Sequence, residues 1–145
     1  MNYDFDKSIG KLTQQISKKI GANLEKKFVE NGISLKATDW SAIAMLYKHG
    51  KRNQRDIAIF MGLDKVKIKR TIDRLEKDKL VLREESKIDK RFNIIVLTSA
   101  GKKIYKQLVP YAEEAISDAY KGILPDDINK CLNVLDKIKD NLIEK

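Results

Sequence analysis

The sequence predicts a mainly α-helical protein of the α+β class, and three observations lead to this prediction. Apolar residues recur at steps of three and four along most of the 145 residues, as they do in amphipathic helices. Two helical patterns within residues 53–79 are separated by a single glycine, which predicts a helix-turn-helix. Two runs rich in β-favouring residues, 81–86 and 92–97, predict one hairpin. A chain of this length suits a single domain.

The first predicted helix runs from Asp6 to about Glu30. Its apolar face consists of Ile9, Leu12, Ile16, Ile20, Leu24 and Phe28. Asn31 and Gly32 end it, since either residue accepts a left-handed backbone. A second helix follows Leu35 and ends at Gly50. Its predicted inner face consists of Trp40, Ile43, Ala44, Leu46 and Tyr47.

The helix-turn-helix of residues 53–79 comes next. Asn53 can cap a short helix, and its inward residues are Ile57, Ala58 and Met61. Gly62 permits the positive φ of a sharp turn, and Asp64 can cap the longer helix that follows. The longer helix has one predicted buried face, formed by Ile68, Ile72 and Leu75.

The opposite face of the longer helix is mainly basic. At about 100° per residue it carries Val66, Lys69, Arg70, Asp73, Arg74 and Lys77, with Lys67 at its margin. A helix of this kind after a glycine turn can enter the major groove of DNA, where Val66 can contact a thymine methyl. An ordinary solvated face is the alternative. Such a face usually mixes both signs of charge, whereas Asp73 is the single acidic residue among these outward positions.

The tip of the predicted hairpin is also basic, because it carries Lys87, Lys90 and Arg91. A basic tip directly after a helix-turn-helix can reach the phosphate backbone or the minor groove of DNA. The alternative is a solvated β-turn that has no partner.

Two helices complete the chain. Thr98 can cap a helix over residues 99–121, and Pro125 with two aspartates opens the last helix. The apolar stripe of the former helix consists of Ile104, Leu108, Tyr111, Ala112, Ala115 and Ala119. That of the latter consists of Ile128, Leu132, Leu135, Ile138 and Leu142.

The apolar stripes of the first and last helices are longer than a compact helix-turn-helix core needs to cover itself. We expect these stripes to pack on a second copy of the chain; a closed intramolecular bundle is the alternative.

The positive charge is concentrated in the middle of the chain. Residues 51–91 contain 14 basic and 8 acidic residues, a net charge of +6 out of the total of +9. Residues 1–50 have a net charge of +3, and residues 92–145 have none. This clustering, with a pI near 9.5, indicates a polyanionic partner. Charge alone does not distinguish nucleic acid from an anionic membrane surface.

Composition argues against several other classes. Cys131 and His49 are the only cysteine and the only histidine, so neither an intramolecular disulfide nor a Cys/His metal cluster can form. We therefore expect no cofactor and no enzymatic activity.

The N-terminal residues lack the features of a signal peptide, and no apolar stretch approaches the ~18 residues of a spanning helix. These features predict a cytoplasmic protein that does not use a membrane. Cys131 adjoins the last apolar stripe, so we expect it in the core or in an interface.

Two segments resemble a known family. Asp89-Lys90-Arg91 followed by Leu97-Thr98-Ser99-Ala100-Gly101 resembles the D-x-R and L-T-x-x-G signature of MarR-type winged-helix regulators. The stretch IKRTIDRLEKDKLV of residues 68–81 is similar to that family's recognition helix and its exit into the wing. The resemblance implies a homodimer on a palindromic operator in double-stranded DNA, usually acting as a repressor. It also implies that a small phenolic or lipophilic acid can bind between the dimer helices and the DNA-binding lobe and release the DNA.

The resemblance also implies roles for individual residues. Arg91 matches the wing arginine that enters the minor groove, Asp89 matches its acidic partner, and Lys69 and Arg70 match positions that approach bases and phosphates. With the charge pattern, the full set of candidate DNA-binding residues is Gln54, Lys65, Val66, Lys67, Lys69, Arg70, Arg74, Lys87, Asp89, Lys90 and Arg91. The chain divides into a DNA-binding lobe over 35–98 and dimerisation helices over 6–31 and 99–145, all within one domain, 1–145. Within the lobe, the helix-turn-helix covers about 53–79 and the wing about 81–97.

This chain departs from the family pattern at three places. Lys36 stands where a Ser or Thr cap is usual, and Ile59 and Phe60 stand where polar residues are usual. The N-terminal cysteine of the peroxide-sensing members is absent, so we do not expect redox sensing by that route. A winged-helix module that docks on proteins, without specific DNA recognition, is the alternative function.

Overall fold

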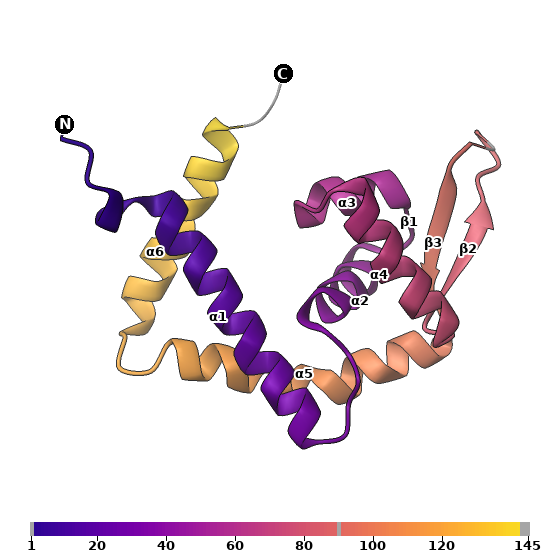
Figure 1. Ribbon diagram of the computed structural model, residues 1–145, viewed down its shortest axis with the longest axis horizontal. Coiled ribbons are helices and arrows are strands. Elements are labelled where there is room, and N and C mark those ends of the chain that lie inside the picture. Colours follow the sequence, from indigo (N-terminus) through magenta and orange to yellow (C-terminus); the bar gives the residue numbers. More distant parts are fainter. Residues whose placement is uncertain (1, 90, 143–145) are drawn as a thin grey trace.

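The computed structural model describes residues 2–89 and 91–142, which form six α-helices, a 3-10 turn and a three-stranded antiparallel sheet. The elements are η1 (Phe5–Lys7), α1 (Ile9–Glu30), α2 (Ala37–His49), β1 (Arg52–Asn53), α3 (Gln54–Met61), α4 (Lys65–Lys77), β2 (Val81–Glu85), β3 (Asn93–Leu97), α5 (Ser99–Ala119) and α6 (Pro125–Asn141). All six predicted helices and the predicted hairpin are confirmed. Figure 1 shows α1 and α6 on one side and α2, α3, α4 and the strands on the other, with α5 running below both. Within residues 2–89 and 91–142, no helix is both long enough and apolar enough to cross a membrane.

Three predicted helix caps are confirmed. The side chains of Asn53, Asp64 and Thr98 each accept a hydrogen bond from the backbone N–H three residues later, at 2.7, 2.8 and 3.0 Å. Each bond satisfies a backbone donor that the first turn of a helix leaves without a partner. These three caps fix the starts of α3 and α4, which form the helix-turn-helix, and of α5, which follows the wing.

The start of α2 is capped from elsewhere, because Lys36 has no acceptor to offer. The Asp39 carboxylate accepts from the Lys36 N–H at 2.9 Å, and Glu25 of α1 accepts from the Ala37 N–H at 2.9 Å. The cap that the family pattern supplies by a Ser or Thr is therefore supplied here by two carboxylates, one of them on another helix.

The sheet has the order β1-β3-β2. Strand β1 was not predicted, since its two residues are too few to produce a pattern; Arg52 pairs with Ile95 of β3. The almost continuously apolar run of β3 also did not indicate which face is buried. The structure shows that Ile95 and Leu97 are buried while Ile94 and Val96 are only half-buried.

Two apolar clusters form the interior. The larger one joins α2, α3, α4 and the sheet through Ile43, Ile57, Ile68, Ile72, Leu75 and Ile95. The smaller one joins α1 and α5 through Leu24, Phe28, Leu108 and Ala115. The larger cluster holds the helix-turn-helix and the wing to α2, so these elements share a core of their own.

The predicted inner face of α2 is only partly right. Ile43 and Leu46 are buried, but Ala44 and Trp40 are half-buried and Tyr47 is 39% exposed. Ala42 and Met45 are buried in their place. The reason is that α2 packs on the helix-turn-helix on one side and on α5 on another. Its buried residues therefore do not follow one stripe along the helix. The aromatic residues lie at the α5 side, where Tyr105 stacks on Tyr47 and on Trp40 with ring centroids 3.8 and 5.3 Å away.

A tight turn connects α4 to the wing. Lys79 has a left-handed backbone, with φ of 62°, and its N–H donates to the Glu76 carbonyl at 2.9 Å. The Leu80 N–H donates to the Leu75 carbonyl at 2.9 Å, which completes the hydrogen-bond pattern of a Schellman motif. The Thr98 hydroxyl donates to the Lys79 carbonyl at 2.8 Å, so the start of α5 holds this turn in place.

Candidate nucleic-acid interface

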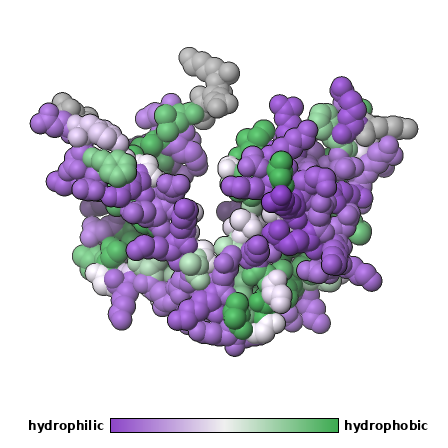
Figure 2. All heavy atoms as spheres, viewed as in Figure 1, coloured by the Kyte–Doolittle hydropathy of each residue, from purple (hydrophilic) through white to green (hydrophobic). Residues whose placement is uncertain are grey.

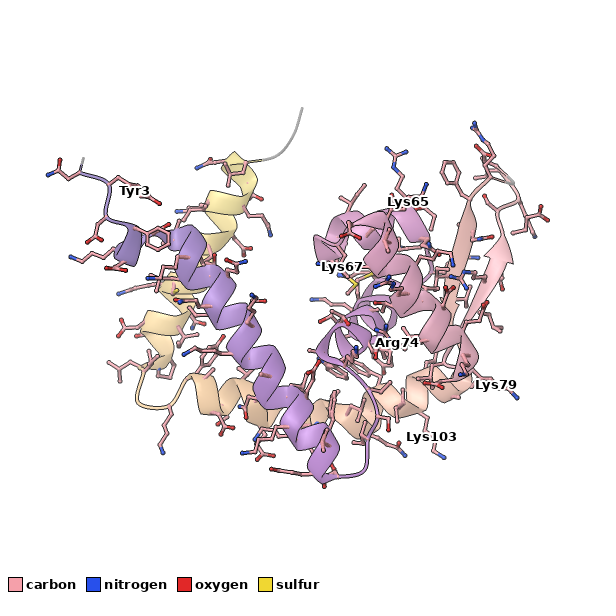
Figure 3. The ribbon with its side chains drawn as sticks, viewed as in Figure 1. Tyr3, Lys65, Lys67, Arg74, Lys79 and Lys103 are labelled. Atoms are coloured by element: carbon pink, nitrogen blue, oxygen red, sulfur yellow. The ribbon has the colours of Figure 1, made fainter. Side chains whose placement is uncertain are left out.

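The first half of α4 presents a basic outer face, as predicted. Gly62 has φ of 64°, which makes the sharp turn from α3 to α4. Ile68, Ile72 and Leu75 are buried beneath α4. The exposed residues of its first two turns are Lys65, Val66, Lys67, Lys69 and Arg70. In Figure 3, Lys65 and Lys67 mark the start of α4 and Arg74 lies further along it, beside α2.

Arg74 does not point freely outward, so its predicted orientation is wrong. Its Nη2 donates to Asp39 of α2 at 2.7 Å and contacts the Thr71 hydroxyl at 3.5 Å. Asp39 is only 2% exposed, so this is a half-buried ion pair that joins α2 to α4. The Arg74 Nε is buried and has no hydrogen-bond partner among the described residues. Because α2 covers the side of α4, the buried arc of α4 extends to Thr71, and Arg74 at its edge is half-buried.

An ion-pair network connects α4 to the wing. Arg83 of β2 donates to Asp73 at 2.6 Å and to Glu76 at 2.7 Å, and its Nη2 lies 3.4 Å from the Gln54 amide oxygen. Asp73 also accepts from Lys69 at 2.8 Å. Hydrogen bonds from Lys69 and then from Arg83 lower the pKa of Asp73, so its carboxyl stays ionised near neutral pH. No sequence pattern indicated a role for Arg83, because only the packing of the hairpin on α4 brings its partners to it.

The tip of the wing holds Arg91 in a fixed orientation. The Arg91 Nε and Nη2 donate to the two Asp89 carboxylate oxygens at 3.0 and 2.7 Å, and the Arg91 backbone N–H donates to Asp89 at 3.0 Å. The side-chain bonds first, and then the backbone bond, lower the pKa of Asp89; the same side-chain bonds raise that of Arg91. The Arg91 side chain is still 83% exposed. This pairing agrees with the orienting role that the family resemblance implies for Asp89. Lys87 is exposed at the same tip, and Lys90 lies outside the described residues.

Three cations from separate elements surround one cavity. The cavity has a volume of about 540 Å³ and lies between α3, the start of α4 and the wing, with Arg55, Lys65 and Arg91 among its lining residues. Gln54 lines the same cavity, together with apolar residues such as Ile59 and Phe92. Arg55 was not among the candidates predicted from the sequence. It lies in the first turn of α3, the first helix of the helix-turn-helix, and a basic residue at that place could have indicated a phosphate contact. Converging cations of this kind suit the phosphates of a nucleic-acid backbone.

A second cavity separates the two sides of the molecule. It has a volume of about 740 Å³ and is lined by α1, α2, α3 and α5, including Lys18, Trp40, Phe60, Met61 and Ile116. Figure 2 shows the molecule deeply hollowed between the side of α1 and the side of α3. Ile59 and Phe60 are 69% and 64% exposed, so the departure from the family pattern in α3 leaves apolar surface exposed beside the two cavities. Within residues 2–89 and 91–142, no three His, Cys, Asp or Glu side chains gather where they could hold a metal ion.

Known proteins resemble this chain in sequence. The model of the MarR family matches residues 35–92, which include the helix-turn-helix and most of the wing. The uncharacterized HTH-type transcriptional regulator YkoM of Bacillus subtilis strain 168 is 26% identical over 100 residues, which make up 69% of this chain and 65% of YkoM. The chain therefore covers slightly less than two thirds of that relative.

Solved structures match nearly the whole chain. A MarR-family transcriptional regulator from Silicibacter pomeroyi is 28% identical, with a TM-score of 0.77 over 92% of this chain and 89% of that one. CouR from Rhodococcus jostii RHA1, solved with bound p-coumaroyl-CoA, is 23% identical, with a TM-score of 0.81 over 99% of this chain and 100% of CouR. The second likeness shows a shared fold.

Proposed function

We propose that this chain is a winged helix-turn-helix transcriptional regulator of the MarR family, and that it acts as a homodimeric repressor on a palindromic operator in double-stranded DNA. The observation that carries the proposal is the convergence of Arg55, Lys65 and Arg91 around one cavity of the lobe. Cations from α3, α4 and the wing thus share one surface, which a DNA backbone can follow.

The DNA contacts that we propose fall into two groups. Lys65, Val66, Lys67, Lys69 and Arg70 on α4 face the major groove, where Arg70 can pair with a guanine edge. Lys87 and Arg91 on the wing reach the backbone and the minor groove, with Asp89 orienting Arg91. We assign Arg74 to the support of α4, since Asp39 already binds its guanidinium. Gln54 and Lys90 stay candidate contacts.

Replacing residues of the two groups should change DNA binding in different ways. Arg70→Ala should cost about 1 to 3 kcal/mol per half-site and relax the preference at one operator position. Lys87→Ala should weaken all sequences alike and make the salt dependence shallower by roughly one per subunit. Arg91→Ala should cost most where the contacted minor groove is narrow and rich in A·T pairs. The measurement is binding of each variant to a panel of operator duplexes at two salt concentrations.

The control for these variants is Lys103→Ala. Lys103 is an exposed lysine near the start of α5, and Figure 3 shows it far from Lys65. Its removal takes away the same charge outside the proposed surface, so operator affinity should change little. If Arg70→Ala and Arg91→Ala bind like the wild type while folded, the DNA-binding function is wrong and a protein-docking module takes its place. A flat response of the wild type to salt would argue for the same alternative.

The proposed homodimer is supported by apolar surface that the single chain leaves exposed. All 17 residues of α6 lie in the described part of the chain, and none of them is buried. On α1, Ile9, Leu12 and Ile16 are 48%, 43% and 53% exposed, although they continue the stripe of the buried Leu24 and Phe28. Cys131 is exposed rather than in the core, so only its expected place in an interface stays a prediction.

We propose that the cavity between α1, α2 and α5 binds a small lipophilic or phenolic acid that releases the DNA. Apolar residues such as Phe60, Met61 and Ile116 line much of it, and Lys18 supplies a cation. CouR, which has the same fold, was solved with p-coumaroyl-CoA bound. Trp40, the only tryptophan, lines the cavity, so bound aromatic acids should quench its fluorescence. Titration with p-coumarate and with benzoate, each paired with an operator-binding assay, measures both effects; unchanged emission and unchanged DNA affinity would contradict the proposal.

A further inference from the structure

Asp73 lies on the outer side of α4 between two cations. Its Oδ2 accepts from the Lys69 Nζ at 2.8 Å, and its Oδ1 accepts from the Arg83 Nη2 at 2.6 Å. The side chains of Lys69 and Asp73 are 67% and 44% exposed, whereas that of Arg83 is 18% exposed. One carboxylate therefore pairs both with a proposed DNA-contacting residue and with a half-buried residue of the wing.

The two ion pairs differ in strength. The Lys69–Asp73 pair joins two exposed side chains at i and i+4, with the cation on the N-terminal side, which is the less favourable order in a helix. Exposed pairs of this kind contribute little and are screened by salt. Arg83 instead spans two carboxylates, since its Nη1 also donates to Glu76 at 2.7 Å, and a planar guanidinium suits this geometry. Lys69 can therefore leave Asp73 easily, and Arg83 cannot.

The arrangement affects how Lys69 meets DNA. In the free protein its charge is largely cancelled by Asp73, and an uncompensated carboxylate beside DNA phosphates would repel them. Resting on the function proposed above, we propose that Asp73 competes with DNA for Lys69. Asp73 thereby suppresses binding to non-specific DNA, while Arg83 still pairs with Asp73 once Lys69 has moved to the operator.

Lys69 and Asp73 each keep a partner of opposite charge or a hydrogen-bond acceptor throughout the exchange. On the operator, a guanine edge or a well-placed phosphate replaces the Asp73 carboxylate as the acceptor for Lys69, and Asp73 keeps its bond to Arg83. On DNA without such an acceptor, Lys69 stays on Asp73 and contributes little attraction. The lowered pKa of Asp73 means that the competing carboxylate is charged at neutral pH. Asp73 is then a specificity-determining residue that acts through Lys69.

The first test compares Asp73→Asn with the wild type on two duplexes of equal length. One is a duplex that the wild type selects from a random-sequence library, and the other is a mixed-sequence duplex. Asp73→Asn should bind the mixed-sequence duplex roughly three- to tenfold more tightly at low salt, with a much smaller gain on the selected duplex. Asp78→Asn is the matched control, because it removes an exposed carboxylate from the other end of α4. A specificity ratio that is unchanged in Asp73→Asn, or lowered equally in Asp78→Asn, would overturn the proposal.

The second test separates this role of Arg83 from simple support of the wing. Arg83→Gln leaves Glu76 without a cation and leaves Asp73 with Lys69 as its one partner, so Lys69 is held on Asp73 and binding to the selected duplex should fall by about tenfold. Adding Asp73→Asn to the same chain should restore most of the loss if the loss is electrostatic. No recovery in the double variant would mean that Arg83 only holds the wing, and the proposal would be wrong. Circular-dichroism melts confirm that each variant is folded.

Binding of the wild type to the two duplexes distinguishes failure of the proposed function from failure of the role of Asp73. A wild type that selects no duplex from the library, or that binds both duplexes equally, would refute sequence-specific DNA binding itself. A wild type that discriminates between them, together with an Asp73→Asn variant that discriminates equally well, would refute only the role of Asp73.

Discussion

Gly101→Ala is expected to lower the free energy of unfolding by about 3 kcal/mol and the melting temperature by roughly 10 °C. Gly101 is buried in the first turn of α5, directly beneath the base of the wing. A Cβ atom there would overlap the Leu80 carbonyl oxygen and would lie only 2.5 Å from the Leu97 Cδ1. The carbonyl is backbone and cannot rotate away, so α5 and the wing would have to move apart.

The same substitution should weaken operator binding in the fraction that stays folded. The Leu80 carbonyl accepts bonds from the Thr98 N–H and hydroxyl, both at 3.0 Å, and these bonds hold the wing to α5. Displacing this junction shifts Arg91 relative to α4. Thermal melts followed by circular dichroism, with operator binding at 10 °C, measure the two effects.

Gly10→Ala is the matched control for this prediction. Gly10 lies in the first turn of α1, where a Cβ would meet nothing closer than the Ser8 hydroxyl at 3.7 Å. Alanine is favoured over glycine in a helix by up to about 1 kcal/mol, so this variant should be at least as stable as the wild type. If Gly101→Ala were equally stable, the close packing of α5 against the wing would not be the reason for glycine at this position.

The features that the sequence predicted well are local ones. The Asn53, Asp64 and Thr98 caps act within three residues of themselves, so composition and period were enough to identify them. The turn at Gly62 and the buried face of α4 were predictable for the same reason.

The features that the sequence did not predict depend on packing between distant segments. Arg74 has the same spacing as the outward lysines, and its partner Asp39 lies 35 residues away. Arg83 reaches Asp73 and Glu76 only because the hairpin folds back on α4. Periodicity shows that a residue is polar and near an edge of the helix face, but it does not show which neighbour will cover that edge. The exposure of Lys65, Lys67, Lys69 and Arg70 was therefore predictable, whereas the ion pairs around them are seen only in the structure.

These restraints bear on how the lobe recognises DNA. The Asp39–Arg74 pair holds α4 to α2, the Arg83 network holds the wing to α4, and the Asp89–Arg91 pair orients the tip. These ion pairs thereby pre-organise the side chains of α4 and the wing that we propose as DNA contacts. Pre-organisation reduces the entropy lost when a complex forms, which favours specific binding without added contact area.

The remaining large effect concerns assembly. The wild type should sediment at micromolar concentration with twice the 16.7 kDa mass of the chain. Ile16→Asp combined with Leu132→Asp should yield a monomer, because each copy would bury two uncompensated carboxylates in the proposed interface. Ile16 on α1 and Leu132 on α6 are 53% and 46% exposed in the single chain, so the substitutions should leave its own fold intact.

The loss of the dimer should also reduce operator affinity by about 100-fold or more, because one lobe alone loses the gain from binding two linked half-sites. The expected operator is an inverted repeat with half-site centres about 10 bp apart, one helical turn of DNA. Val29→Asp is the control: Val29 is 74% exposed near the end of α1, outside the apolar stripe, and should stay dimeric with full affinity. A wild type that sediments at 16.7 kDa, or a double variant that stays dimeric, would contradict the proposed interface. A double variant that is monomeric yet binds the full operator like the wild type would show that dimerisation does not contribute to DNA recognition.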